Sequence, residues 1–141
     1  MGMQYRAQED SLRVGACATF TKTVSESDVY LYAGITGDFS PNHVDEVYMQ
    51  GGKYGRRIAH GTLTVGFMSA ASARLHLGRT VSLGYDRIRF VAPVFFGDTI
   101  TTTYTISRID AERRRVHADV TCVNQDGTVV AAAINVRAFV D

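Results

Sequence analysis

The sequence has 141 residues, close to the size of one domain, and 45% of them are hydrophobic while 21% are charged. This balance is typical of a folded globular protein and argues against long disordered stretches. Fifteen Lys and Arg residues against fourteen Asp and Glu residues leave a formal net charge of +1. No overall field therefore attracts nucleic acid or a membrane surface, and we expect neither as a partner.

No apolar run approaches the ~20 residues needed to cross a bilayer. The amino-terminal stretch also lacks the apolar segment of a secretion signal. Cys17 and Cys122 lie far apart, each within an alternating apolar pattern, so a disulfide framework and a zinc site are both poor interpretations. We therefore expect one domain over residues 1–141, located in the cytoplasm.

The first part of the chain predicts a strand, a helix and a loop. Apolar residues alternate with small or polar ones from Leu12 to Lys22, which predicts a strand with one buried face. Ser25 and Asp28 resemble a capping box, which predicts a helix that Gly37 ends. Residues 37–58 are rich in glycine and contain one short helical segment, and such loops often carry function.

The next segment predicts a buried helix over residues 61–78, because it is apolar or small nearly all round until Arg74. One face of this helix consists of small residues at helical spacing: Thr62, Gly66, Ser69 and Ala73. A neighbouring element can approach that face closely, and Gly78 is a suitable terminator.

The remaining chain alternates apolar and polar residues in four segments, around residues 87–90, 100–107, 115–122 and 128–140. Their short connections predict an antiparallel meander. Together these elements predict an α+β fold, with an antiparallel sheet wrapped around one central helix.

Several common site types are absent from the sequence, which contains no phosphate-binding glycine loop, no H-E-x-x-H and no G-x-S-x-G. The four histidines lie on four different predicted elements: His43, His60, His76 and His117. That is a weak pattern for metal, so we expect no metal and no resident cofactor.

The strongest chemical signal is the segment from Gly37 to Asp45. Asp38 and His43 are separated by a turn that contains Pro41, so their side chains can converge without a helix. A carboxylate and an imidazole in one pocket can take a proton from water and deliver one elsewhere. The alternative is that both residues only serve the local turn and short helix.

A second signal is His60-Gly61 directly before the predicted buried helix. Backbone N–H groups at a helix N-terminus lack partners, and glycine lets a substrate oxygen come close. Such N–H groups can stabilise a carbonyl oxygen that gains charge during a reaction.

These residues together resemble the MaoC-like hydratases, the (R)-specific 2-enoyl-CoA hydratases. That family carries G-D-x-N-P-x-H, then a His-Gly before the central helix, then a serine eight residues beyond that glycine, and later F-x-x-P-V-x-x-G-D. The residues that match are Gly37, Asp38, Pro41, His43, His60, Gly61, Ser69, Phe90, Pro93, Val94, Gly97 and Asp98. Ser40 stands where the family usually has asparagine, and a serine can replace it as a shorter hydrogen-bonding group.

The resemblance implies the hot-dog fold, a homodimer, and an acyl-CoA thioester as substrate. It also implies reversible syn addition of water to a trans-2-enoyl thioester, in which CoA is part of the substrate and no cofactor takes part. The candidate catalytic residues are Asp38 and His43 for the water, Gly61 for the thioester oxygen, and Ser69 to orient the pair. The candidate substrate-binding residues are His60, Thr62, Lys53, Arg56 and Arg57.

Each of these assignments has a simpler alternative. Ser69 can be a small residue that permits helix–sheet contact, and His60 can merely cap the helix. The basic residues of the loop can be solvated surface.

Alternative functions also remain open. One is a dehydratase that acts on carrier-protein-bound or branched acyl thioesters, and another is an acyl-CoA-binding module without catalysis. A hot-dog thioesterase is disfavoured, because positions 62–73 contain no Asp, Glu, Asn or Gln to activate water on the carbonyl. The same absence argues against the acyl-carrier-protein dehydratases that place their acid on this helix.

Overall fold

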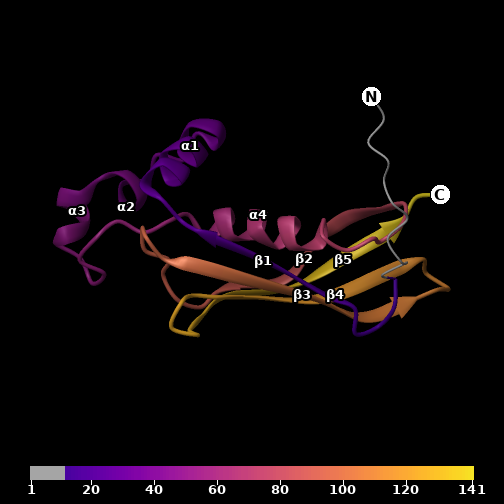
Figure 1. Ribbon diagram of the computed structural model, residues 1–141. Helices are drawn as coiled ribbons and strands as arrows, with labels where there is room; N and C mark the ends of the chain where they lie inside the picture. The colour runs from indigo at the N-terminus through magenta and orange to yellow at the C-terminus, as the bar shows by residue number, and fades with distance from the viewer. Residues whose placement is uncertain (1–11) are drawn as a thin grey trace, which may run out of the picture.

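The computed structural model describes residues 12–141, which form a five-stranded antiparallel sheet and four helices. The strands are β1 (Cys17–Thr23), β2 (Thr80–Phe90), β3 (Thr99–Asp110), β4 (Arg115–Val123) and β5 (Val129–Phe139). The helices are α1 (Glu26–Thr36), α2 (Pro41–Val44), α3 (Glu46–Gln50) and α4 (Gly61–Ser72). Figure 1 shows α4 lying along one face of the sheet, while α1, α2 and α3 gather beyond one end of it. The α+β architecture predicted from the sequence is confirmed.

The strand order β1-β3-β4-β5-β2 corrects the predicted simple meander. Strands β3, β4 and β5 do form a meander, but β2 pairs with β5 at the far edge. Strand β1 pairs along β3 instead, from Cys17 opposite Thr105 to Thr23 opposite Thr99. The segment 91–98 must therefore carry the chain from the β2 edge across the sheet to β3, which pairs with β1 and β4. Two register shifts in β2 and a positive φ at Arg87 show that this edge strand is irregular.

Several predicted boundaries differ from the structure, and among them β2 begins at Thr80 rather than near residue 87. The first strand begins at Cys17 rather than Leu12, because Gly15 adopts a left-handed turn with φ 88°. The predicted short helix is divided into α2 and α3 at Asp45, whose extended backbone ends one and whose side chain caps the other. Helix α4 ends at Ser72, and Gly78 belongs to the turn before β2.

The predicted capping box of α1 is confirmed. The Ser25 hydroxyl accepts from the Asp28 N–H at 3.1 Å, and the Asp28 carboxylate accepts from the Ser25 N–H at 2.9 Å. At the other end, Gly37 adopts φ 83° and its N–H bonds to the Ala33 carbonyl. This left-handed residue turns the chain sharply, so that Asp38 follows the helix directly.

Helix α4 is only partly buried. Its inner face packs into the core with Phe67, Met68 and Ala71, which are nearly inaccessible. The small-residue face that includes Gly66 and Ser69 is exposed, so nothing in the described part of the chain covers it. The core beneath α4 is formed mainly by the inward residues of β3, β4 and β5.

Both cysteines are free, Cys17 exposed and Cys122 buried, as expected from their placement. Within residues 12–141, no helix has the length and apolarity that a membrane crossing requires.

Candidate active site

Asp38 lies between α1 and α2 with its carboxylate held by Ser40. The Ser40 hydroxyl and N–H both donate to Oδ1 of Asp38, at 2.5 and 3.1 Å. These bonds stabilise the ionised form and lower the pKa of the Asp38 carboxyl below its usual range. Ser40 thus performs the hydrogen bonding expected of it, and the other oxygen, Oδ2, is left to face two histidines.

His43 lies in α2, which Pro41 begins, and it is only 6% exposed. Its Nδ1 bonds to the Ile58 carbonyl at 2.8 Å, and the Ile58 N–H returns a bond to the Asn42 carbonyl. Because a carbonyl only accepts, Nδ1 carries the proton and Nε2 of a neutral ring has a free lone pair. Nε2 lies 3.8 Å from Oδ2 of Asp38.

The environment of His43 favours its neutral form. Burial is the largest influence and lowers the pKa of the imidazole below 6.5, and the nearby His60 acts in the same direction. The bond to Ile58 and the charge of Asp38 oppose this shift without reversing it. His43 can therefore accept a proton at neutral pH.

His60 precedes α4 and stacks on His43, with ring centroids 3.7 Å apart and planes inclined by 26°. Its Nε2 donates to the Asp38 carbonyl at 2.9 Å and lies 3.9 Å from Oδ2 of Asp38. Although His60 occupies the N-cap position of α4, its side chain makes no capping bond. The helix-cap interpretation is therefore wrong.

Gly61 begins α4, and no side chain within residues 12–141 caps the N–H groups of its first turn. A Cβ at this position would lie 2.9 Å from ring carbons of Phe90, so a larger residue would require that exposed ring to move. The N–H groups of this first turn are placed where they could meet a ligand oxygen.

A cavity of about 310 Å³ joins His43 to Gly61. Its remaining walls are largely apolar and include Tyr54, Phe90 and Val130. A mostly apolar cavity with a few convergent polar groups is the usual form of a small-molecule site. A ligand in this cavity would meet both the His43 ring, a proton acceptor, and the N-terminus of α4 at Gly61.

The side chains of Asp38, His43 and His60 also form a cluster whose ligand atoms lie within 4.8 Å of one another. This cluster could not be predicted from the sequence, because the two histidines belong to different elements. Bound to a metal through Nε2, His60 would have to give up its bond to the Asp38 carbonyl. The bonds present suit a hydrogen-bonded acid–base group better than a metal centre.

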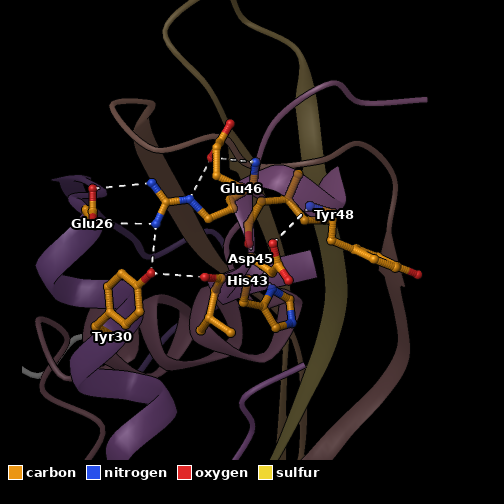
Figure 2. A network of polar contacts seen from close by, with 9 residues as sticks. Glu26, Tyr30, His43, Asp45, Glu46 and Tyr48 are labelled. Carbon is orange, nitrogen blue, oxygen red and sulfur yellow. Dashed lines mark hydrogen bonds and ion pairs between the residues drawn. The ribbon is translucent and has the colours of Figure 1, made fainter. Parts of the chain in front are cut away.

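The guanidinium of Arg57, suggested by the sequence as a phosphate contact, is already bonded to residues of the chain. Figure 2 shows Glu26, Tyr30 and Glu46 around its guanidinium, which binds Glu46 at 2.6 Å and Tyr30 at 2.8 Å. The bond to Glu46 is the main cause that raises the pKa of Arg57 above its usual value. The Tyr30 hydroxyl in turn donates to the Val44 carbonyl at 3.2 Å, also drawn in Figure 2. This network ties α1 to the α2–α3 segment that carries His43.

The other predicted substrate-binding residues lie apart from the acid–base group. Lys53 and Arg56 are exposed, and the Arg56 guanidinium stacks 3.8 Å from the Phe95 ring centre. Both remain available to an anion. Thr62 is exposed and its hydroxyl accepts from Tyr32 at 2.7 Å.

Ser69 is not brought to the pair by this chain. Eight residues along a helix separate it from Gly61 by about 12 Å, and it lines a different cavity with Ser72 and Arg137. Spacing in the motif predicted proximity, but the helix carries the serine away from Asp38 and His43.

Sequence reasoning missed two residues of this site. Tyr32 presents its ring edge to His60, with centroids 4.8 Å apart, and Phe90 covers Gly61. The hydroxyl of Tyr32 was the one feature that could have indicated a role here, because a half-buried tyrosine usually has a hydrogen-bond partner.

Comparisons with known proteins find relatives over most of the chain. The family described as MaoC like domain matches residues 14–127. An (R)-specific enoyl-CoA hydratase from Rhodospirillum rubrum is 39% identical over 113 residues, which cover 80% of this chain and 78% of that protein. A 3-hydroxybutyryl-CoA dehydratase from Methylorubrum extorquens is 34% identical, over 86% of this chain and 77% of that one.

Solved structures show the same fold. An unliganded R-hydratase from Pseudomonas aeruginosa is 32% identical with a TM-score of 0.81, over 92% of this chain and 84% of that one. An (R)-hydratase from Aeromonas caviae has a TM-score of 0.84 at 24% identity, over 92% of this chain and 98% of that one. The predicted hot-dog fold is thereby confirmed.

The Arg57 network predicts a loss of stability on substitution. Arg57→Gln leaves Glu46 and Tyr30 without their partner, so the free energy of unfolding should fall by about 1–2 kcal/mol in urea titrations. Lys53→Gln, at an exposed position, should stay within about 0.5 kcal/mol of the wild type. Equal stability of the two variants would contradict the structural role of Arg57.

Proposed function

The chain belongs to the MaoC-like domain family and is a hydro-lyase of that family, and on this premise we propose that it is an (R)-specific enoyl-CoA hydratase. The reaction is the reversible syn addition of water to a trans-2-enoyl-CoA, which gives the (R)-3-hydroxyacyl-CoA. The observation that carries this proposal is the placement of the Asp38 carboxylate opposite the unprotonated Nε2 of His43, 3.8 Å apart. That distance is too long for a direct hydrogen bond and suits one water oxygen bound to both groups.

This arrangement determines which group accepts and which group donates each proton. Asp38, held ionised by Ser40, accepts one hydrogen bond from the water and orients it. His43 takes a proton from the water as the oxygen bonds to C3 of the enoyl group, and the C2–C3 π electrons move toward the thioester. The His43 imidazolium then gives a proton to C2, so that one OH and one H are added. Dehydration reverses these steps at the same groups.

The thioester oxygen becomes enolate-like when C3 is attacked. We assign its stabilisation to the Gly61 N–H, because the first turn of α4 lacks a side-chain cap and adjoins the cavity that His43 lines. The apolar walls, Phe90 and Val130 among them, suit the acyl chain. Dehydration of carrier-protein-bound or branched acyl thioesters would use the same groups.

We further propose that the protein is a homodimer. Strand β2 forms a free edge of the sheet and exposes Val81 and Leu83, which are 45% and 54% accessible. The small-residue face of α4 is also exposed. An open edge with apolar side chains is prone to pair with another chain, and a helix face of small residues permits close packing.

The catalytic pair is tested with crotonyl-CoA by following the absorbance of the enoyl thioester. Asp38→Asn and His43→Ala should each reduce kcat/KM by about 10² or more while the proteins stay folded, since one acid–base group contributes that much. The two losses should not add in the double variant, because the residues act as a unit.

Asp119→Asn and His76→Ala, both at exposed positions, are the matched controls and should keep wild-type rates. Near-normal turnover in Asp38→Asn would remove this carboxylate from the mechanism. Release of free thiol without hydration would instead indicate a thioesterase.

The lowered pKa of His43 predicts the acid side of the pH profile. A base acts in its unprotonated form, so activity is complete above the pKa of His43 in the folded protein and is lost as the pH falls through it. Because burial places that pKa below 6.5, the midpoint of the acid limb of kcat/KM should lie below pH 6.5. An acid limb centred above pH 6.5 would contradict His43 as the base.

The proposed dimer is tested by sedimentation at micromolar concentration. The wild type should sediment as a dimer, and Leu83→Lys should shift it toward monomer because a charge at the β2 edge opposes strand pairing. Val14→Lys, at an exposed site before β1 on the opposite edge, should leave the dimer intact. A wild-type monomer would refute the assembly.

A further inference from the structure

His60 is the most enclosed titratable side chain at the site. It is 1% exposed, and its ring lies between the His43 ring on one side and the edge of Tyr32 on another. The cavity beside His43 and Gly61 does not include it among its walls. His60 therefore lies behind His43 and Gly61, the two groups of the site that line this cavity.

The polar contacts of His60 indicate that it holds the main chain of Asp38. Its Nε2–H donates to the main-chain carbonyl of Asp38 at 2.9 Å. Its Nδ1 is buried and has no hydrogen-bond partner within the described residues 12–141. Buried polar atoms without partners are rare, and an apolar ring would fill the same space without that penalty. The Nε2–H bond to Asp38 is the feature that only a polar side chain supplies here.

The chain directly before His60 is held by the crossover segment 91–98 between β2 and β3. The neighbouring Ala59 N–H bonds to the Val94 carbonyl at 2.8 Å, and Ile58 bridges to Phe95. The Val94 segment is itself fixed by Asp98, whose carboxylate accepts from the Phe95 N–H at 2.9 Å. His60 thus links a segment anchored to the sheet with the loop that carries Asp38.

We propose that His60 is a positioning residue, which anchors the Asp38 main chain through its Nε2–H and supports the His43 ring by stacking. It touches no reacting atom and acts by keeping the Asp38 carboxylate and His43 Nε2 at the separation that one water spans. This inference rests on the proposed hydratase function for its kinetic consequence, although the anchoring itself does not depend on it.

Two substitutions at His60 test the contribution of the N–H donor and that of the ring separately. His60→Gln keeps an N–H near the position of Nε2, and His60→Phe keeps a stacked ring without a donor. With crotonyl-CoA, His60→Phe should lower kcat by about 10- to 100-fold while KM changes by less than about 3-fold, as expected for a residue that orients a catalytic group. His60→Gln should restore kcat to within about 5-fold of the wild type. His76→Phe, at an exposed position, is the control and should match the wild type.

A second measurement is independent of activity. Amide hydrogen exchange at Ser40 and His43, whose N–H groups bond to Asp38 Oδ1 and to the Ser40 carbonyl, reports how firmly this loop is held. Exchange at both should be at least about 10-fold faster in His60→Phe and close to the wild type in His60→Gln.

The outcomes distinguish this inference from the proposed function. A raised KM with unchanged kcat in His60→Phe would mean that His60 binds substrate, and would overturn the inference. Equal exchange rates in the wild type and His60→Phe would overturn it as well. A wild type that hydrates no enoyl thioester would refute the hydratase, while faster exchange in His60→Phe would still support the anchoring of Asp38.

Discussion

The burial of two stacked imidazoles, each bonded to a main-chain carbonyl, is the constraint on which the site depends. Because Nδ1 of His43 donates to Ile58, its Nε2 keeps a lone pair directed to the side of Asp38. Burial, and then the His60 ring stacked 3.7 Å away, lower the pKa of His43 and favour its neutral form. The pair therefore presents a neutral base beside an ionised carboxylate, which is the combination that water activation requires.

The remainder of the fold brings these groups together from three separate segments. Gly37 ends α1 and turns the chain into Asp38, while the network around Arg57 ties α1 to the segment that holds His43. The crossover between β2 and β3 fixes the segment that leads to His60. An active site assembled in this way depends on tertiary contacts that are distant from the reacting atoms. Loss of such a contact is therefore expected to lower both the stability of the fold and the turnover rate.

Features with a local cause could be predicted from the sequence. The capping box at Ser25 and the termination at Gly37 each depend on a few neighbouring residues, and the structure contains both. The proximity of Asp38 and His43 also followed from their short separation and the intervening Pro41.

Features that arise from tertiary contacts could not be predicted. Nothing near His60 in the sequence indicates that it stacks on a ring seventeen residues earlier, because that contact requires the crossover segment to be in place. Charge alone does not show that Arg57 is enclosed by Glu26 and Glu46 while Lys53 is exposed. The pairing of β2 with β5 likewise depends on how the whole sheet closes, and a motif offset cannot show that α4 carries Ser69 away from the pair.

The stereochemistry of the product tests the central claim most directly. Crotonyl-CoA is incubated with the protein in deuterium oxide, and the configuration at C3 and the position of the deuterium at C2 are determined. The account predicts (R)-3-hydroxybutyryl-CoA with the hydroxyl and the deuterium added to the same face, because the Asp38/His43 pair handles the water from one side. An (S)-hydroxyl group, or addition to opposite faces, would contradict it.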